Sequence, residues 1–443
     1  MQFTLSPRKF LVSLIRFSAL FGFCAGMAAH AESLFVDSPK ALNEAIALVQ
    51  AGDEIVMRDG TWRDLPIRFK GSGTESAPIV LRAETSGQVR LTGRSMLRMA
   101  GSWLEVRGLV FTDGSTEGAD VIEFRFSSSE FAQHSRLVDC AIIDYNPRSD
   151  RSYKWVSVYG QDNAVENCHF SGKTNQGTLL TVWLDAAQSP NRTIIRGNYF
   201  GPRPSSNGKN EYETIRIGTS GTSHLDSMAL VEGNYFEACN GEIEVISNKS
   251  CGNIYRNNVF DRCEGQLTLR HGNDCLIEGN AFYGASLDRT GGVRVIGSGH
   301  VVRQNYFQGL RGEELRAVIS LMSGEERPKP SGYFPVVEAE VRDNVIVNCE
   351  LAFGIGSNSS SKPTVLPPAH SIIAGNRIFG GRGDLIEFYR ESPELRFEAN
   401  QVSGYTLPEV EGFVAVPDTD GSLKAAAMKP KPDRQNYGPS WIR

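Results

Sequence analysis

An asparagine-centred pattern of apolar and polar positions repeats along most of the chain. In each unit an apolar or aromatic residue is followed by two spacers, an Asn, one further residue and an aromatic or aliphatic side chain. The clearest units centre on Asn198, Asn234, Asn258, Asn280, Asn305, Asn344 and Asn400, with a shifted form at residues 165–170. From Asn198 to Asn344 successive Asn residues are 36, 24, 22, 25 and 39 apart, so the short steps set the length of one unit and the long steps carry loops.

Short β-rich segments at this interval, with no helical periodicity between them, predict coils that stack on one another. We therefore predict an all-β, single-domain, right-handed parallel β-helix. The asparagines would form a ladder at a bend between strands, where the side-chain amide can bond to backbone and tolerate left-handed geometry. We interpret them as structural residues and not as ligands.

Stacking should also align the strands that follow each Asn. The inward positions on this alignment are Ile215, Ile243, Leu267 and Val293. The outward positions are Arg216, Glu244, Thr268 and Arg294, with Glu242 beside them. Because side chains alternate between the two faces of a strand, this register predicts a column of polar side chains on the outside of the β-helix.

The two ends of the β-helix carry different patterns. Residues 38–50 begin with Ser38 as a cap and Pro39 at the first helical position, and Leu42, Ile46 and Val49 share one face. We expect this helix to cover the open end of the solenoid. The β-helix is predicted over residues 32–416, followed by an extended tail over residues 417–443, which is rich in Pro, Lys and Asp.

Residues 1–31 read as a secretory signal. Arg8 and Lys9 precede a mostly apolar stretch, and Ala29-His30-Ala31 is a small-residue cleavage site. The stretch is too short for a stable membrane span. We therefore expect cleavage after Ala31 and a periplasmic or secreted protein.

Composition narrows the choice of partner. The signal carries three of the 46 Lys and Arg residues and no acidic residue, so the mature chain has a net charge of −8. That charge argues against a nucleic-acid binder, and it leaves an anionic polymer possible only through a local basic strip or a bridging cation. Seven of the eight cysteines remain after cleavage, which predicts mainly buried thiols and leaves one disulfide bridge open.

One group of charged residues points to chemistry. Glu242 and Glu244 leave the same face of a β-branched run, Lys249 follows shortly after, and Arg270 comes 21 residues later, close to one coil. Such a group can hold a hard divalent cation beside a base and an acid, which removal of a proton next to a sugar carboxylate requires. An isolated Glu-x-Glu motif by itself usually indicates the solvated face of a strand. Here the surrounding repeat places Glu242, Glu244, Lys249 and Arg270 on neighbouring turns.

The chain resembles polysaccharide lyase family 6, which contains alginate lyases and chondroitinase B, over nearly all of its mature length. The segments that carry this resemblance are residues 52–62, 81–93, 241–250, 269–272 and 438–441. Residues 241–250 read Gly-Glu-Ile-Glu-Val-Ile-Ser-Asn-Lys-Ser and residues 269–272 read Leu-Arg-His-Gly, and this pair with its spacing is the specific part of the likeness.

By that resemblance Lys249 would be the Brønsted base and Arg270 the acid. Glu242 and Glu244 would bind Ca²⁺ together with an Asn before the preceding strand, for which Asn210 is preferred over Asn207. His271, directly after the acid, and Arg216 are expected to contact substrate. The implied activity is calcium-assisted β-elimination of an anionic polysaccharide, alginate first and dermatan sulfate as the alternative.

Other functions are compatible with the same residues. A β-helical hydrolase would use two or three carboxylates and no lysine. A uronate epimerase would abstract the same proton and return it to the opposite face. A calcium-dependent binding protein would need the metal and the basic groove without a base. Residues 308–340 form a large insertion between coils and are expected to shape the cleft, while the sequence leaves the oligomeric state open.

Overall fold

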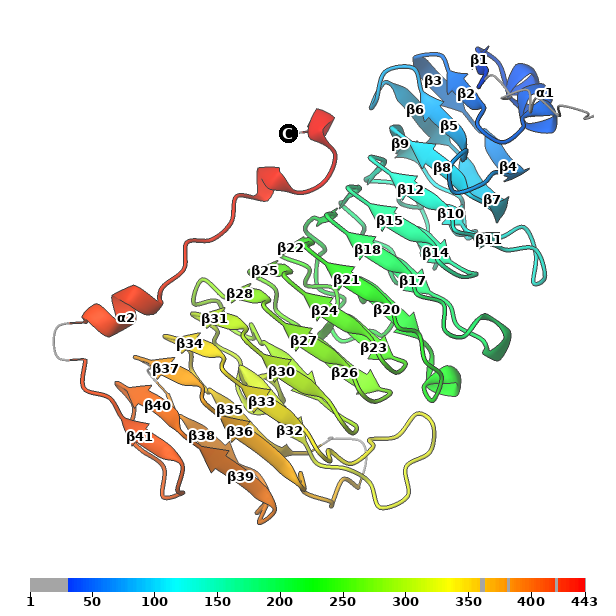
Figure 1. The fold of residues 1–443 in the computed structure, drawn as a ribbon. Helices are drawn as coiled ribbons and strands as arrows, with labels where there is room; N and C mark the ends of the chain where they lie inside the picture. Colours follow the sequence, from blue (N-terminus) through cyan, green and yellow to red (C-terminus); the bar gives the residue numbers. More distant parts are fainter. Residues whose placement is uncertain (1–30, 359–362, 381–382, 419–420, 443) are drawn as a thin grey trace, which may run out of the picture. The chain divides into compact units, whose positions relative to one another are not determined.

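The computed structural model describes residues 31–442 with gaps at residues 359–362, 381–382 and 419–420, so the predicted signal lies outside the described residues apart from Ala31. Three long sheets make up the fold, here named A, B and C, and in every sheet the neighbouring strands are parallel (Figure 1). Successive strands pass from sheet A to sheet B to sheet C and return to A one level further on. This arrangement confirms the predicted parallel β-helix.

Sheet A has 14 strands. In spatial order they are β1 (Ser33–Val36), β2 (Glu54–Met57), β5 (Ile79–Ala83), β8 (Leu104–Arg107), β12 (Arg136–Val138), β15 (Ala164–Glu166), β18 (Ile194–Arg196), β21 (Leu230–Glu232), β24 (Ile254–Arg256), β27 (Leu276–Glu278), β30 (Val301–Arg303), β33 (Glu340–Arg342), β36 (Ser371–Ala374) and β39 (Leu395–Glu398).

Sheet B also has 14 strands. They are β3 (Gly60–Arg63), β6 (Val89–Gly93), β9 (Leu109–Gly114), β13 (Ala141–Ile143), β16 (His169–Ser171), β19 (Tyr199–Phe200), β22 (Tyr235–Glu237), β25 (Val259–Asp261), β28 (Ala281–Tyr283), β31 (Tyr306–Gln308), β34 (Val345–Val347), β37 (Arg377–Phe379), β40 (Asn400–Ser403) and β41 (Phe413–Ala415).

Sheet C has 13 strands. They are β4 (Pro66–Ser72), β7 (Met96–Ser102), β11 (Ala132–Gln133), β10 (Ile122–Glu123), β14 (Val156–Val158), β17 (Leu180–Val182), β20 (Ile215–Gly218), β23 (Glu244–Lys249), β26 (Gln266–His271), β29 (Val293–Val295), β32 (Ile319–Met322), β35 (Phe353–Ser357) and β38 (Ile386–Phe388).

Helical segments are few and short among the described residues. The α-helices are α1 (Pro39–Leu48) and α2 (Ser422–Ala427), and the 3-10 turns are η1 (Ala186–Gln188), η2 (Ser220–Thr222), η3 (Glu314–Arg316), η4 (Arg434–Asn436) and η5 (Ser440–Ile442). In α1, the Ser38 side chain accepts a hydrogen bond from the Ala41 amide at 3.3 Å, and Leu42 and Ala45 are buried. The helix packs on β1, β2 and β4, so the predicted N-terminal capping helix is present.

The Asn repeat accounts for the core on two adjacent sheets. The aromatic or aliphatic residue two positions after each Asn faces inward on sheet B, where five of these residues and Phe170 form a stack of six Phe rings with centroids 4.4–5.4 Å apart. These rings are at most 3% exposed. The apolar residue three positions before each Asn faces inward on sheet A, and Ile195 and Val231, for example, are fully buried.

The asparagines form the predicted ladder between sheets A and B. From Asn234 to Asn400, each side-chain oxygen accepts from the backbone N–H and the side-chain amide of the preceding ladder Asn, at 2.9–3.1 Å. Asn376 belongs to the same ladder. The expected left-handed geometry falls on the residue before the ladder Asn, as at Asn257 and Gly279, because the tight bend occurs one position earlier.

The predicted register of the second strand in the outward column was wrong by three residues. Ile215 pairs with Ile246 and not Ile243, so the residue beside Arg216 is Ser247, while Glu244 lies opposite Gln266. β23 also has an irregularity between Glu244 and Ile246 where it pairs with β26, and the adjacent residues Val245 and Ile246 are both buried. This breaks the alternation of inward and outward side chains on which the predicted register was based. The rest of the column, Thr268 beside Arg294, agrees with the prediction.

After β41 the chain runs back along the outside of sheet B toward earlier coils (Figure 1). Lys431 pairs with Asp261 at 2.9 Å, and the Tyr437 ring packs on Tyr235. Near the end of this segment the Trp441 indole donates to the carbonyl of Asp139 at 3.1 Å. All seven cysteines of the described residues are buried and unpaired, which confirms the expected buried thiols.

Candidate active site

Three carboxylates meet at the start of sheet C strands on adjacent coils. One carboxylate oxygen from each of Glu213, Glu242 and Glu244 lies within 4.8 Å of the other two. Glu213 comes just before β20, Glu242 lies in the turn before β23, and Glu244 opens β23. Glu213 and Glu244 are 3% and 7% exposed, so this negative charge is concentrated in a largely desolvated place.

The three carboxylates differ in the hydrogen-bond and ion-pair partners that the protein provides. Glu244 accepts hydrogen bonds from Ser247 and from Arg294, which lies across the sheet on β29. Glu242 accepts only from the Tyr212 backbone amide, at 3.1 Å, and Glu213 accepts from the Thr178 hydroxyl, also at 3.1 Å. Among the described residues neither Glu213 nor Glu242 forms an ion pair within 4.0 Å.

The burial and mutual proximity of the three carboxylates change the pKa of Glu242. Burial, followed by the charges of Glu213 and Glu244, raises the pKa of Glu242 to about 8. Buried carboxylates that repel one another are stabilised by a hard cation, because Ca²⁺ prefers several oxygen ligands including carboxylates. The donor set therefore fits calcium, the metal expected from the sequence.

Asn210, the predicted third metal ligand, lies next to this cluster. Together with Glu242 it lines a cavity of about 180 Å³ at the corner between sheets B and C. Its side chain is exposed and its backbone carbonyl accepts from the Gln176 side chain at 3.2 Å. Asn207, the other candidate, is also exposed and has a positive φ. The assignment of a ligand role to Asn210 stays a prediction.

Glu213 was missed at the sequence level. In register, Glu213 precedes Ile215 by two positions as Glu244 precedes Ile246, so the two acids occupy matching positions on adjacent strands. The repeated Glu-x-Ile is the signal that could have found it. Its local backbone is held by Arg203, a 2% exposed side chain that donates to the carbonyls of Tyr212 and Glu213 at 2.7 and 2.8 Å.

The predicted base and acid lie on neighbouring strands beside these carboxylates. Lys249 ends β23 and Arg270 lies near the end of β26, the next strand of sheet C. The Nε atom of Arg270 is 4.0 Å from a carboxylate oxygen of Glu244. Lys249 is half-buried, and its ammonium forms no hydrogen bond or ion pair with any described residue. Lys249 and Arg270 therefore lie on neighbouring turns of the β-helix, as predicted, and the Lys249 ammonium is available to a ligand.

The loop after β32 surrounds Arg270. Its guanidinium donates to the carbonyls of Gly332 and Ser331 at 2.8 and 3.0 Å and lies 4.3 Å above the centre of the Tyr333 ring. Burial lowers the pKa of Arg270 from its usual value. This loop is part of the predicted insertion at residues 308–340, although that range also contains η3 and β32. Its contacts place it at the wall of the site.

The two predicted substrate-contacting residues occupy different settings. His271 is 1% exposed, lies 3.1 Å from the Ser220 hydroxyl and meets the edge of Phe334. Burial, then the charges of Arg270 and Lys249, lower the pKa of His271 to about 3, so the ring is neutral. Arg216 is half-buried and lies 5.5 Å from the centre of the Trp183 ring. His271 thus lies behind the surface, and Arg216 lies one coil before Lys249.

The sequence model of the chondroitinase B family matches residues 36–404, most of the chain. The chain belongs to the chondroitinase B family. This confirms the resemblance to polysaccharide lyase family 6, because similar solved structures carry that family name. No curated protein matches the chain.

Three solved structures illustrate the likeness within the chondroitinase B family fold. The family 6 alginate lyase AlyGC is 37% identical to this chain, with a TM-score of 0.82. The matched region covers 92% of this chain and 56% of AlyGC. A mannuronic acid specific family 6 lyase from human gut microbiota is 30% identical with a TM-score of 0.81, covering 93% and 96%. The family 6 polysaccharide lyase Pedsa3628 from Pseudopedobacter saltans is 26% identical with a TM-score of 0.75, covering 92% and 99%. The chain therefore spans about half the length of AlyGC.

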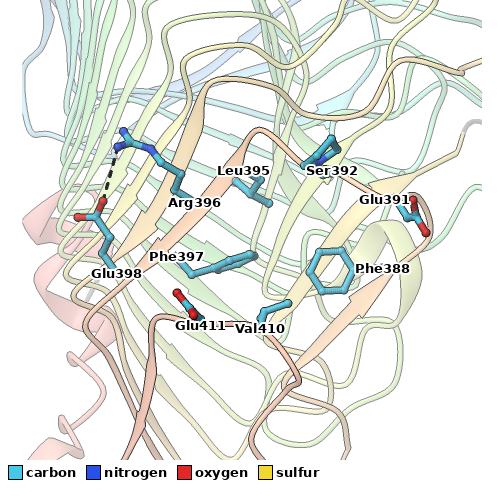
Figure 2. Close-up of a pocket in the computed structure, with 10 residues that line it drawn as sticks. Phe388, Glu391, Ser392, Leu395, Arg396, Phe397, Glu398, Val410 and Glu411 are labelled. Atoms are coloured by element: carbon cyan, nitrogen blue, oxygen red, sulfur yellow. Dashed lines mark ion pairs between the residues drawn. The ribbon is translucent and has the colours of Figure 1, made fainter.

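A further cavity of this chondroitinase B family member lies apart from that site. Figure 2 shows it among Phe388, Phe397, Leu395 and Val410, with a volume of about 760 Å³. These residues belong to the last coils or to the loop before β41, and none of them is part of the carboxylate, lysine and arginine site. In the described part of the chain no helix has the length and apolar character needed to cross a membrane.

Proposed function

We propose that the protein is a polysaccharide lyase that cleaves alginate by calcium-assisted β-elimination and releases oligosaccharides with an unsaturated end. The observation that carries the proposal is the meeting of an unpaired lysine, a half-enclosed arginine and three carboxylates on adjacent strands. Family membership supports the reaction class, and the likeness to two lyases described as alginate-cleaving or mannuronic acid specific favours alginate over dermatan sulfate.

In this proposal Lys249 removes the proton from the carbon next to the uronate carboxylate. A lysine can take a proton only in its neutral form. A base positioned at the reacting carbon accelerates proton transfer by about 10²–10⁴-fold. Lys249 is half-buried at the end of β23, and its ammonium makes no hydrogen bond or ion pair with a described residue.

Arg270 serves the leaving oxygen in the same step. As the lysine takes the proton, the electron pair of the broken C–H bond forms the new carbon–carbon double bond, and the electron pair of the broken C–O bond leaves with the glycosidic oxygen. Arg270 donates a hydrogen bond to the departing oxygen and supplies its proton, and its place on the next strand puts it on the neighbouring sugar. The carbonyls of Ser331 and Gly332 hold the planar guanidinium in one orientation.

Glu213, Glu242 and Glu244 would hold the calcium ion, with Asn210 as a further ligand. When bound, calcium would neutralise the substrate carboxylate and so stabilise the negative charge that builds there. Arg216, Lys249 and Arg270 supply positive charge on three neighbouring strands of sheet C, whereas Arg294 is buried against Glu244. This local basic strip would let a chain of negative net charge bind an anionic polymer.

The substrate is a polymer found outside cells, so we place the protein in the periplasm or in the secreted fraction, in agreement with the signal predicted at residues 1–31. The decisive test is incubation of the purified protein with alginate, polymannuronate, polyguluronate and dermatan sulfate in separate reactions. We expect ultraviolet absorbance from unsaturated ends with alginate and its mannuronate or guluronate blocks. A folded, calcium-loaded protein that yields no unsaturated product from any of the four would overturn the proposal.

A further inference from the structure

One inward column of sheet C contains a single polar residue. The residues in register at this position, from β14 to β35, are Val158, Val182, Ile217, Asn248, Leu269, Val295, Leu321 and Ile355. Every one of them is buried, and Asn248 is 0% exposed. An amide at a place where the coils on either side carry Ile217 and Leu269 is an exception that packing does not explain.

A matching exception occurs on sheet A in the same coil. The residues in register there, from β15 to β36, are Val165, Ile195, Val231, Tyr255, Ile277, Val302, Val341 and Ile373. Tyr255 is the one polar member, and it is also 0% exposed. Both apolar columns are therefore interrupted in the coil that carries Lys249, the residue directly after Asn248.

The two exceptions are bonded to each other. The Tyr255 hydroxyl donates to the side-chain oxygen of Asn248 at 2.7 Å, and the Asn253 amide donates to the same oxygen at 2.7 Å. The Asn248 amide in turn donates to the backbone carbonyls of Ser250 at 2.9 Å and His271 at 2.7 Å. Because the hydroxyl and the Asn253 amide both donate to the oxygen, they fix which end of the Asn248 side chain faces the two carbonyls.

Those carbonyls belong to the residues that directly follow Lys249 and Arg270. The ladder between β23 and β26 also slips by one residue at this point, so that Asn248 pairs with Leu269 but Lys249 pairs with His271. A slip in register leaves backbone groups without their regular partners, and the Asn248 amide supplies a donor at that place. It joins the two strands between the proposed base and the proposed acid.

We propose that Asn248, oriented by Tyr255, is a positioning residue that fixes Lys249 and Arg270 relative to each other. The inference rests on the proposed lyase function, because it assigns a task within that site. The ladder asparagines repeat on successive coils from Asn198 to Asn400 and serve stability, whereas among the described residues the Asn248 and Tyr255 pair occurs once, beside the proposed base. Neither side chain reaches the surface, so the effect passes through the backbone of Ser250 and His271.

Two variants separate positioning from packing. Tyr255→Phe keeps the ring and removes the hydroxyl, and Asn248→Leu restores the apolar residue found at Leu269 on the next coil. We expect about a tenfold loss in kcat for Tyr255→Phe and about a hundredfold loss for Asn248→Leu, with KM changed less than about threefold, because a shift of about 1 Å in a reacting group costs rate and not affinity. A role in stability alone predicts that the apolar Asn248→Leu is as active as the wild type.

Tyr145→Phe is the matched control. Tyr145 is equally buried, its hydroxyl donates to the carbonyls of Gly93 and Ser95 at 2.7 and 2.8 Å, and it lies in an early coil away from the site. It should lose stability to a similar extent as Tyr255→Phe and keep the wild-type kcat.

Steady-state kinetics on alginate, with thermal unfolding of each variant, decide the matter. Wild-type kcat in folded Tyr255→Phe would overturn the positioning role while leaving the lyase proposal intact. Equal losses of kcat in Tyr145→Phe and Tyr255→Phe would also overturn it, since they would indicate a general loss of packing. Absence of cleavage by the wild-type protein would overturn both the lyase function and this inference. If Asn248→Leu does not fold, Tyr255→Phe against Tyr145→Phe still gives the answer.

Discussion

The asparagine ladder and the carboxylate cluster are both made of buried polar side chains, yet they are built in opposite ways. In the ladder, every amide from Asn198 to Asn376 finds the same partners on the next coil, at 2.9–3.1 Å. In the cluster, three carboxylates are within 4.8 Å of one another, and only Glu244 has a protein cation as a partner. In the ladder, the repeated asparagines provide each other with hydrogen-bond partners. In the cluster, the repeat is broken, and carboxylates remain without a protein cation, so a ligand can bind them.

The contrast extends to the backbone. Strands on either side of the ladder pair without register shifts from β15 to β36, whereas β23 and β26 pair with two shifts in six residues. The shifts place Glu244 opposite Gln266 and Lys249 opposite His271. Single shifts also occur between β6 and β9 and between β32 and β35, but the pair with two shifts is the one that carries the proposed chemistry.

The largest expected effect of a single change is at the base. Lys249→Ala should lower the rate of eliminative cleavage by about 10³-fold or more, because it removes the amine proposed to take the proton. Its thermal unfolding should match the wild type, since Lys249 contributes no hydrogen bond or ion pair to the described structure. The matched control is Lys40→Ala on α1, an exposed lysine. Product formation at the wild-type rate by folded Lys249→Ala would show that another residue is the base.

Arg270→Lys tests whether geometry or charge matters at the acid. Lysine keeps the charge but lacks the planar guanidinium that donates to both Ser331 and Gly332, so we expect about a hundredfold loss of turnover with a smaller change in KM. Arg303→Lys, an exposed change on β30, serves as the control. Near-wild-type turnover in Arg270→Lys would place the acid elsewhere.

In the ladder the same kind of change should affect stability alone. Asn344→Ala removes the acceptor of Asn305 and the donor to the Val302 carbonyl and Asn376, leaving buried groups without partners. We expect a loss of about 2–3 kcal/mol in unfolding free energy with an unchanged kcat for the folded fraction. Asn43→Ala, exposed on α1, should change neither. A drop in kcat for folded Asn344→Ala would mean that the ladder and the site are coupled.

The smallest effect concerns the metal-free cluster. The pKa of Glu242 is raised from 4.5 to about 8 in the folded chain, so between these values the folded state keeps a proton that the unfolded state releases. The stability from this group is therefore fully present below about pH 4.5 and is lost as pH rises toward 8, by about 1–2 kcal/mol after allowing for solvent screening.

Thermal unfolding of the chelated protein across this pH range measures the effect. Glu242→Gln, which cannot ionise, should flatten the dependence, and added Ca²⁺ should do the same because it favours the charged carboxylates. Chelation should also abolish activity, with Ca²⁺ restoring it better than Mg²⁺, which holds its waters more tightly. A chelated, metal-free protein with full activity would remove calcium from the proposed function.

The Asn repeat was sufficient to predict the fold, but it predicted only part of the candidate site. Asn spacing sufficed for the β-helix because one unit equals one coil and the ladder repeats with little variation. The same argument from spacing failed for β23. The adjacent residues Val245 and Ile246 are both buried there, so the alternation of inward and outward side chains is broken. Glu213 escaped notice for a related reason. The predicted pairing of Ile215 with Ile243 puts Glu213 opposite Gly241, whereas the observed pairing of Ile215 with Ile246 puts it opposite Glu244.

The C-terminal segment gives the β-helix a property that a plain stack of coils lacks. In a solenoid each coil contacts only its neighbours, so the free energy of unfolding is a sum of local steps and the terminal coil can fray alone. Here the Trp441 indole is bonded to Asp139, a residue 302 positions earlier, and Lys431 and Tyr437 contact the coils between. Loss of the last coils therefore also releases contacts on the first third of the chain. Unfolding becomes more nearly all-or-none, and a protease that removes the final residues would convert a cooperative molecule into one that opens from its end.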